Sequence, residues 1–294
     1  MAQDAAAEGA EVVVALDFDG VLCNSVGESS RSAFLCLQKR YPDVLKGTEW
    51  ENLEDSDAPA WLMDKMRKLR PVVETGYENI LLTRLLLEEY RMAETSGKET
   101  GTRPLTVGEI AANWGEELKD TLMRKYGYTQ DELVHAFGDT RDEWIARDEE
   151  SWLEANSFYE RLGVRDAARY SKANVYIITT KQTRFAEALL KHAGIEVPED
   201  KVYGLGSGPK RDVLADLIAK HPKAQVHFVE DRVETLEGIC KDERLGAVHL
   251  HLANWGFNNA DQRQRGEANP RIEVISPERF REVMCAPVSA EAAT

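Results

Sequence analysis

The sequence predicts an α/β protein: a Rossmann-like parallel sheet sandwiched by helices, with an α-helical cap domain inserted after the first strand. Two observations lead to this prediction. Residues 12–16, VVVAL, form a continuous apolar run, which is typical of a strand buried on both faces of a parallel sheet. After residue 172, strand and helix patterns alternate, which indicates βαβ units. Because a lone buried strand cannot satisfy its backbone groups, we expect the first strand to join the later ones.

These patterns divide the chain into two expected domains. The Rossmann-like core comprises residues 11–24 and 172–285, and the cap comprises residues 25–171. Residues 1–10 and 286–294 are small and polar, so we expect disordered tails there.

The cap is expected to be helical because apolar residues recur in it at spacings of three and four, with few strand signals. Between two of its helices, Glu94–Arg103 has the composition of a loop and is the best candidate for a mobile excursion. The expected helices are Ser32–Tyr41, Ala60–Leu69, Tyr77–Tyr90, Val107–Tyr126, Asp131–Phe137 and Thr140–Asn156.

The alternating part of the core supplies the remaining elements. Pro209 suits the first turn of its helix, where a missing N–H costs nothing. The expected strands are Val175–Ile178, Lys201–Tyr203, Gln225–Val229, Ala247–Leu252 and Arg271–Ile275. The expected helices are Arg184–His192, Pro209–Lys220 and Thr235–Lys241.

Composition excludes several classes of protein. The 294 residues carry 37 Lys and Arg against 52 Asp and Glu, a net charge of -15, which disfavours a nucleic-acid partner. No apolar run approaches the roughly 18 residues of a membrane helix, and the first ten residues lack the features of a targeting segment. We therefore expect no membrane partner and a location in the cytoplasm or the plastid stroma. Four cysteines without a CxxC pair indicate reduced thiols.

Reactive side chains follow four of the expected strands and turns. In an open α/β sheet, ligands bind beyond the carboxyl ends of the strands. Each of these groups taken alone is weak evidence of a functional site, but together they supply the side chains that one reaction needs. The groups are Asp17-Phe18-Asp19-Gly20, Thr179-Thr180-Lys181, Gly206-Ser207-Gly208-Pro209-Lys210 and Glu230-Asp231-Arg232.

That reaction is phosphoryl transfer through an aspartyl-phosphate. A carboxylate can act as the nucleophile, and Mg²⁺ prefers carboxylate and phosphate oxygens, which Asp17 and Asp231 can supply. Asp19, two residues along an extended chain, would protonate the leaving alkoxide and later activate water. Thr179 can donate to a phosphate oxygen. Lys210 can neutralise nucleophile and phosphate, with Lys181 as a rival for that role.

These motifs resemble the haloacid dehalogenase superfamily of phosphatases. ALDFDGVLCNS resembles its first motif, IITTK its second, GPKRDVL its third and HFVEDRVETL its fourth, and the insertion site is similar to that of the helical-cap branch. AVHLHLANWGFNN is similar to a late strand of phosphoglycolate-phosphatase-like members. RPVVETGYENILLTRLLLE resembles an uncharacterised plant and algal group of the superfamily.

The resemblance implies a role for each motif. Asp17 is the nucleophile, and Asp19 is the acid and base, whose backbone carbonyl also binds Mg²⁺. Thr179 holds the phosphate, Lys210 steadies it, and Asp231 completes the metal site. A carboxylate at Asp19 favours phosphate-ester hydrolysis, since dehalogenases and phosphonatases of the superfamily lack one there.

The fourth motif departs from the family pattern. Glu230 stands where a glycine is usual, and Thr235 where a second aspartate is usual. We assign Asp231 as a metal ligand and Glu230 as a residue that contacts the metal ligands without binding the metal itself. The exchanged assignment stays open. Thr180, Lys181 and, from the cap, Arg70 complete the expected phosphate contacts, although packing explains Arg70 equally well.

Two other features have simpler interpretations. His249 and His251 share one strand face, the geometry of a metal pair, but packed or solvated histidines are favoured because a third ligand is not evident. Gly206-Ser207-Gly208 is interpreted as a tight turn that aims Lys210.

The sequence therefore predicts a Mg²⁺-dependent phosphatase that hydrolyses a small phosphomonoester through an aspartyl-phosphate. The expected partner is a small phosphorylated metabolite, such as a sugar phosphate or phosphoglycolate. Two alternatives remain: a phosphomutase with the same intermediate, and a non-catalytic interaction protein that keeps the fold.

Overall fold

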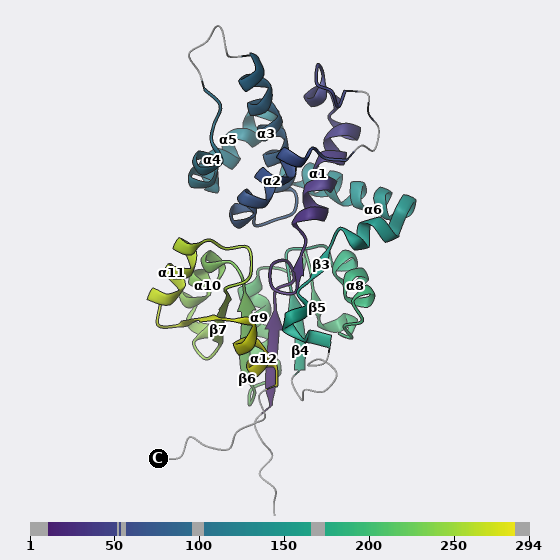
Figure 1. The fold of residues 1–294 in the computed structure, drawn as a ribbon. Helices are drawn as coiled ribbons and strands as arrows, with labels where there is room; N and C mark the ends of the chain where they lie inside the picture. The colour runs from purple at the N-terminus through teal and green to yellow at the C-terminus, as the bar shows by residue number, and fades with distance from the viewer. Residues whose placement is uncertain (1–10, 52, 54–56, 96–102, 166–173, 286–294) are drawn as a thin grey trace, which may run out of the picture. The chain divides into compact units, whose positions relative to one another are not determined.

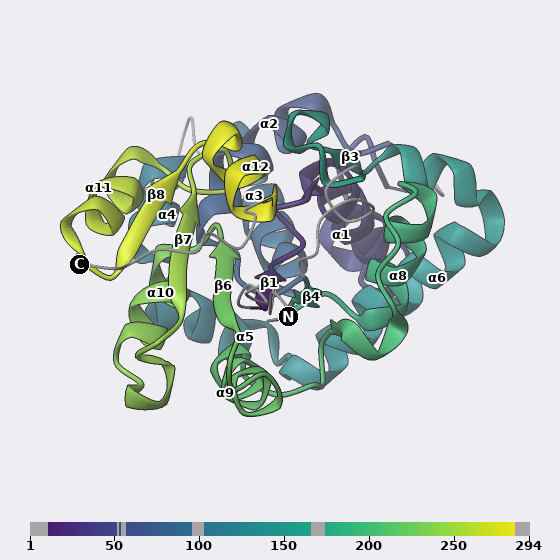
Figure 2. The same cartoon turned by 90° about the horizontal axis from the view of Figure 1, so that it is seen from below.

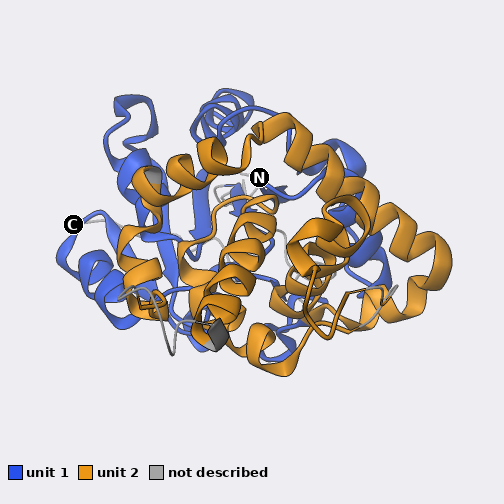
Figure 3. Ribbon diagram, turned by 90° about the horizontal axis from the view of Figure 1, so that it is seen from above, with its two compact units in different colours: residues 1–24, 158–294 blue, residues 25–157 orange. Residues whose placement is uncertain are grey.

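The chain forms two compact units, which Figure 3 shows in separate colours: residues 1–24 with 158–294, and residues 25–157. The computed structural model describes residues 11–51, 53, 57–95, 103–165 and 174–285. The expected disordered tails, 1–10 and 286–294, lie outside the described residues, as does most of the expected loop Glu94–Arg103.

A six-stranded parallel sheet forms the centre of the first unit, in the order β5-β4-β1-β6-β7-β8 (Figure 1). Its strands are β1 (Val12–Leu16), β4 (Asn174–Ile178), β5 (Val202–Tyr203), β6 (Gln225–Glu230), β7 (His249–Ala253) and β8 (Ile272–Ile275). Two more short strands are β2 (Cys23–Asn24) and β3 (Ser157–Phe158). The central place of β1 explains its apolar sequence, since four of its five residues have no exposed surface.

Helices cover the sheet on both faces, as the sequence predicts. The side chains of α9 and α10 pack with Val13, Phe228 and Leu250 on one face, and Figure 2 shows α12 on the face opposite α9. The helices of this unit are α8 (Thr183–His192), α9 (Lys210–Lys220), α10 (Val233–Cys240), α11 (Ala260–Ala268) and α12 (Pro277–Cys285).

The last two helices, α11 and α12, are absent from the sequence-based expectation. In α11, ADQRQRGEA, only Gln262 and Gly266 are buried, so the helix has no apolar period to detect. Its signal was the capping box in which the Asn259 side chain accepts from the backbone N–H of Gln262. In α12, Phe280, Val283 and Met284 are buried at helical spacing, and Pro277 opens the helix.

The second unit is helical, as expected, but its helix boundaries differ from the expected ones. Its helices are α1 (Val26–Arg40), α2 (Ala60–Leu69), α3 (Glu78–Thr95), α4 (Val107–Asn113), α5 (Lys119–Tyr126) and α6 (Gln130–Glu154). The helix expected over Val107–Tyr126 is interrupted at Gly115, whose φ of -6° and ψ of -146° are not helical. Two helices are expected from residues 131 to 156, with a break after Phe137. In the structure α6 continues through that point, and its break comes at Asp148, whose φ of -157° and ψ of 80° are not helical.

The boundary between the units falls earlier than residue 171, where the sequence analysis placed the end of the cap. Unit 2 ends at Ser157. Residues just beyond it contact the sheet unit: the Phe158 ring meets the Phe18 ring edge-on at 5.8 Å, and the Tyr159 N–H donates to the Leu22 carbonyl at 3.0 Å. The sequence could not show these contacts, because Phe18 and Leu22 lie in the loop after the first strand, far along the chain from Phe158 and Tyr159.

A buried ion pair ties α1 to α6 inside the second unit. Arg141 donates from Nε and Nη2 to the two carboxylate oxygens of Glu28, both at 2.7 Å. Ser32 Oγ at 2.7 Å and Trp152 Nε1 at 3.3 Å also donate to Glu28, which has no exposed surface. Four donated hydrogen bonds compensate the loss of hydration of this carboxylate.

No helix among the described residues is both long enough and apolar enough to cross a membrane.

We expect Glu28→Gln to lower the free energy of unfolding by about 3–5 kcal/mol, because Arg141 would keep its charge in a buried place without a compensating carboxylate. Urea unfolding at neutral pH measures the change. The control is Glu143→Gln, since Glu143 pairs with Arg40 at 2.8 Å but its side chain is 46% exposed. Its expected effect is below about 1 kcal/mol. Equal effects of both substitutions would contradict the prediction.

Candidate active site

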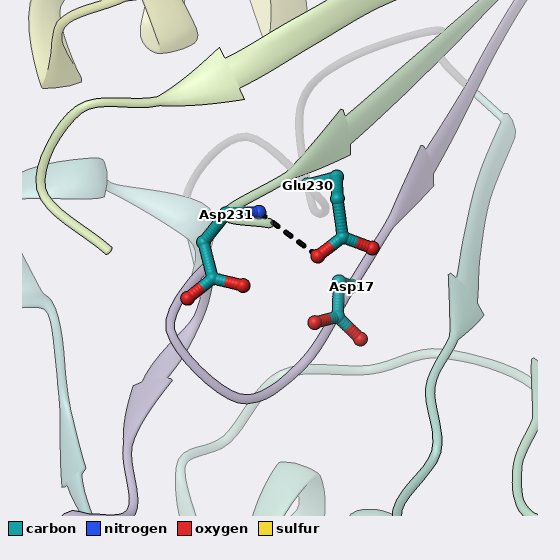
Figure 4. Close-up of side chains that lie close together, drawn as sticks. All are labelled: Asp17, Glu230 and Asp231. Carbon is teal, nitrogen blue, oxygen red and sulfur yellow. Dashed lines mark hydrogen bonds between the residues drawn. The ribbon is translucent and has the colours of Figure 1, made fainter. Parts of the chain in front are cut away.

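Three acidic side chains meet at the carboxyl ends of β1 and β6. These strands are parallel neighbours with Leu16 opposite Val229, so Asp17 and Glu230 are adjacent as each strand ends. The Asp17 N–H continues the pairing by donating to the Val229 carbonyl at 2.9 Å. One carboxylate oxygen from each of Asp17, Glu230 and Asp231 lies within 4.8 Å of the others, and all three residues are buried (Figure 4).

Lys210 joins two of these carboxylates. Its Nζ lies 2.8 Å from Asp17 Oδ1 and 2.7 Å from Glu230 Oε2. Lys210 is the first residue of α9, directly after Pro209. The turn before it contains Gly206 at φ +100° and Gly208 at φ +94°, which side chains rarely allow. The turn therefore delivers Lys210 to the strand ends.

Glu230 has both carboxylate oxygens engaged. Oε2 accepts from Lys210, and Oε1 accepts from the backbone N–H groups of Asp231 at 3.0 Å and Arg232 at 3.1 Å. The side chain thus closes the turn that follows its own strand and orients the lysine.

Asp231 is held by the loop after β7. Its Oδ2 accepts from the Phe257 N–H at 2.6 Å, and its backbone carbonyl accepts from Asn258 Nδ2 at 2.9 Å. Asn258 Nδ2 also donates to the Ala253 carbonyl at 2.8 Å, and Trp255 Nε1 donates to the Val21 carbonyl at 3.1 Å. This loop is not among the segments that the sequence predicts for the site. Its signal was the segment NWGFNN at the end of a strand next to β6.

Two glycines allow this close approach. A Cβ on Gly20, which has φ +89°, would lie 1.9 Å from Asp231 Oδ2. A Cβ on Gly256 would lie 2.3 Å from Asp231 Cβ and 2.8 Å from the Gly20 carbonyl oxygen. The loops on both sides of Asp231 therefore have no room for a side chain.

A second lysine faces the second aspartate. Lys181 Nζ lies 3.2 Å from Asp19 Oδ1, and the Lys181 side chain is 1% exposed. The two lysines that the sequence offered as rivals thus serve different carboxylates, Lys210 with Asp17 and Lys181 with Asp19. Which lysine pairs with which aspartate could not be deduced from the sequence, because each lysine follows the end of a strand or turn and could reach either carboxylate.

The threonines of the second expected motif follow β4. Thr179 is buried, and its Oγ1 accepts from the Lys181 N–H at 3.1 Å. Thr180 is the next residue and is half-buried. Arg70 belongs to the other unit, where its Nη1 donates to the Val73 carbonyl at 2.9 Å, and its phosphate contact stays a prediction.

Burial and charge change the proton affinities of the cluster. Burial raises the pKa of Asp17 to about 7, although the Lys210 ammonium acts in the opposite direction. Burial acts likewise on Glu230, but Lys210 and the backbone N–H donors outweigh it and lower the pKa of that carboxyl. Burial opposes charge on Lys210 as well, yet Asp17 and Glu230 together raise its pKa.

Comparison with known proteins identifies the fold. No family model matches the chain, and no curated protein matches it significantly. A predicted phosphatase from Clostridium acetobutylicum has a TM-score of 0.53 at 15% identity, over 93% of this chain and 97% of that one. A predicted phosphoglycolate phosphatase from Haemophilus somnus 129pt has a TM-score of 0.50 at 16% identity, over 93% of this chain and 96% of that one. A haloacid dehalogenase-like protein from Streptococcus pneumoniae has a TM-score of 0.47 at 14% identity, over 92% of this chain and 96% of that one.

The first two likenesses show that this chain has the fold of those two solved structures along nearly its whole length. The α/β fold class predicted from the sequence is confirmed by this likeness and by the six-stranded parallel sheet. The likeness to a plant and algal group stays a prediction.

We expect Gly256→Ala to displace Asp231, because the new methyl group would meet backbone and Cβ atoms that cannot move as a flexible side chain does. The expected loss is about 1–3 kcal/mol of unfolding free energy, measured by urea titration. Gly238→Ala is the control, since nothing lies within 4 Å of its Cβ on the exposed side of α10. That substitution is expected to be neutral or slightly stabilising. A Gly256→Ala protein as stable as the control would refute the close packing of Gly256 against Asp231.

Proposed function

We propose that this protein is a Mg²⁺-dependent phosphatase, which hydrolyses a small phosphomonoester through an aspartyl-phosphate on Asp17. One observation carries the proposal. Asp17, Glu230 and Asp231 gather in one buried cluster at the strand ends, with the Lys210 ammonium between two of them. The fold shared with two solved structures that are described as predicted phosphatases supports it.

The donor chemistry of the cluster fits Mg²⁺. Three carboxylates against one lysine leave an excess of negative charge in a buried place, and carboxylate oxygens are the ligands that Mg²⁺ prefers. Asp17 and Asp231 would hold the ion, together with the backbone carbonyl of Asp19. When bound, Mg²⁺ supplies positive charge beside the phosphate oxygens. Glu230 is better suited to hold Lys210 than to bind the ion, because both its oxygens already accept hydrogen bonds.

Asp17 is the proposed nucleophile. In the first step its carboxylate oxygen attacks phosphorus in line with the leaving group, the P–O bond of the ester breaks, and an aspartyl-phosphate forms. Lys210, 2.8 Å from Asp17, holds the attacking carboxylate and offsets the charge of the arriving phosphate.

Asp19 is the proposed acid and base. It gives a proton to the leaving alkoxide in the first step and takes one from the attacking water in the second, which releases phosphate and restores Asp17. Lys181 lies 3.2 Å from Asp19 and holds this side chain at the strand end.

Phosphate binding is assigned to the residues after β4 and to Lys210. Thr179 and Thr180 offer hydroxyl donors, and Lys181 and Lys210 offer buried or half-buried ammonium groups in a protein of net charge -15. The proposed substrate is a small phosphorylated metabolite, such as a sugar phosphate or phosphoglycolate.

We expect Asp17→Asn to reduce Mg²⁺-dependent turnover of p-nitrophenyl phosphate by about a thousandfold or more, because an amide cannot form the phosphoenzyme. Released phosphate is the measurement, with a panel of phosphorylated metabolites as substrates. The control is Asp216→Asn on the exposed side of α9, which should keep wild-type turnover. Equal turnover by wild type and Asp17→Asn would contradict the proposal. Turnover that requires a sugar bisphosphate and releases no phosphate would indicate a phosphomutase instead.

The affinity for Mg²⁺ is expected to fall as the pH drops below 7. Asp17 must lose its proton to bind the ion, and burial raises its pKa to about 7 in the metal-free site. Protonation therefore competes with the ion below that pH and ceases to do so above it. We expect the dissociation constant at pH 6 to be about ten times that at pH 8. Calorimetric titration with Mg²⁺ tests this, and equal constants at the two pH values would contradict it.

A further inference from the structure

Three histidines share one face of the sheet, away from the carboxylate cluster. His227 on β6 pairs directly with His249 on β7, and His251 lies two residues further along β7 on the same face. His227 lies three residues before Glu230, which is about 10 Å along an extended strand. The proposed phosphatase reaction has no use for these three side chains.

The three rings lie close together. His227 Nδ1 is 3.0 Å from His251 Nε2, and their ring planes differ by only 8°. The centroids of the His227 and His249 rings are 4.6 Å apart. His251 is buried, His227 is half-buried and His249 is exposed, so the group opens from the sheet toward solvent.

An acidic side chain lies beside the innermost histidine. His251 Nδ1 lies 3.0 Å from Glu273 Oε2, on the neighbouring strand β8. Glu273 is itself held by Arg279 Nε at 2.8 Å. A carboxylate beside Nδ1 favours the proton on that nitrogen, which leaves the Nε2 lone pair directed at His227. Metal-binding histidines are commonly oriented by a carboxylate in this way.

Both inner histidines are neutral at physiological pH. Burial lowers the pKa of His227 to about 4, and the neighbouring His251, His249 and Arg279 act in the same direction. Burial also lowers the pKa of His251 to about 4, against the opposing effect of Glu273. Neutral imidazole is the form that binds metals, so neither ring has to lose its net charge before binding. The proton that His227 Nδ1 donates to His251 Nε2 has to move to His227 Nε2 when Nδ1 binds the metal.

We propose that His227, His249 and His251 form a second metal site, one that takes a borderline divalent transition metal such as Zn²⁺. Two nitrogen ligands of tetrahedral Zn²⁺ lie about 3.3 Å apart, close to the observed separation of His227 Nδ1 and His251 Nε2. Binding replaces the contact between these two nitrogens with two metal bonds, and water completes the coordination.

His249 supplies the third ligand by turning its ring. Among the described residues, the carboxylate cluster is the only group of three whose donor atoms already lie within 4.8 Å of one another, so the histidines need this movement. The side chain of His249 is exposed and can turn at little cost. Nitrogen ligands select zinc, copper or nickel, whereas the oxygen ligands of the other site select magnesium.

The experiment measures Zn²⁺ binding to the full chain by competition with a chromophoric chelator, in excess Mg²⁺ so that the carboxylate site is occupied. We expect one bound zinc ion, and at least tenfold weaker binding in His249→Ala. This substitution removes an exposed side chain and leaves the fold intact. The control is His192→Ala, an exposed histidine at the end of α8, which should bind zinc as wild type does.

Further variants separate the proposal from its alternatives. His227→Gln should weaken zinc binding as well, and Cu²⁺ bound to wild type should show nitrogen couplings in its electron paramagnetic resonance spectrum. Wild-type affinity in His249→Ala, or equal loss in His192→Ala, would overturn the proposal. So would loss of zinc in Asp231→Asn with retention in His249→Ala, because that pattern places the ion at the carboxylates. None of these readouts depends on phosphatase activity.

Discussion

The ammonium group of Lys210 lies between two buried carboxylates, and the rest of the site depends on this contact. Asp17 and Glu230 end adjacent strands, so without a cation their charges would repel each other in a place with little water. Glu230 cannot turn away, because two backbone N–H groups hold its other oxygen. The lysine is therefore fixed, and through it the orientation of Asp17. If Asp17 is the nucleophile, as proposed, a carboxylate held in this way needs little reorganisation when it reacts.

Asp231 owes its position to backbone rather than to charge. The Phe257 N–H, the Asn258 amide and the two glycines at positions 20 and 256 confine it from both sides. Backbone donors in tight loops move less than long side chains do, so this carboxylate is preorganised. One carboxylate is thus held by a lysine and another by the chain itself, and both meet where two parallel strands end.

Much of the fold followed from pattern alone. The apolar run VVVAL predicted a strand buried on both faces of a parallel sheet, and β1 is such a strand. Helix α11 did not follow, because its buried residues are Gln262 and Gly266 and its order depends on packing and a cap. The break in α6 at Asp148 did not follow either, because the surrounding sequence, IARDEES, contains no glycine or proline, which are common signals of a helix break.

The sequence by itself determined which chemical groups stand at the strand ends, since Asp17, Asp19, Thr179, Lys210 and Asp231 follow strands or begin helices that local pattern identifies. Tertiary structure alone decided how they are paired. Lys210 faces Asp17, Lys181 faces Asp19, and a loop 26 residues beyond Asp231 supplies the N–H that holds it. Such contacts depend on strand order and loop geometry, which join distant segments, whereas periodicity reports only neighbours along the chain.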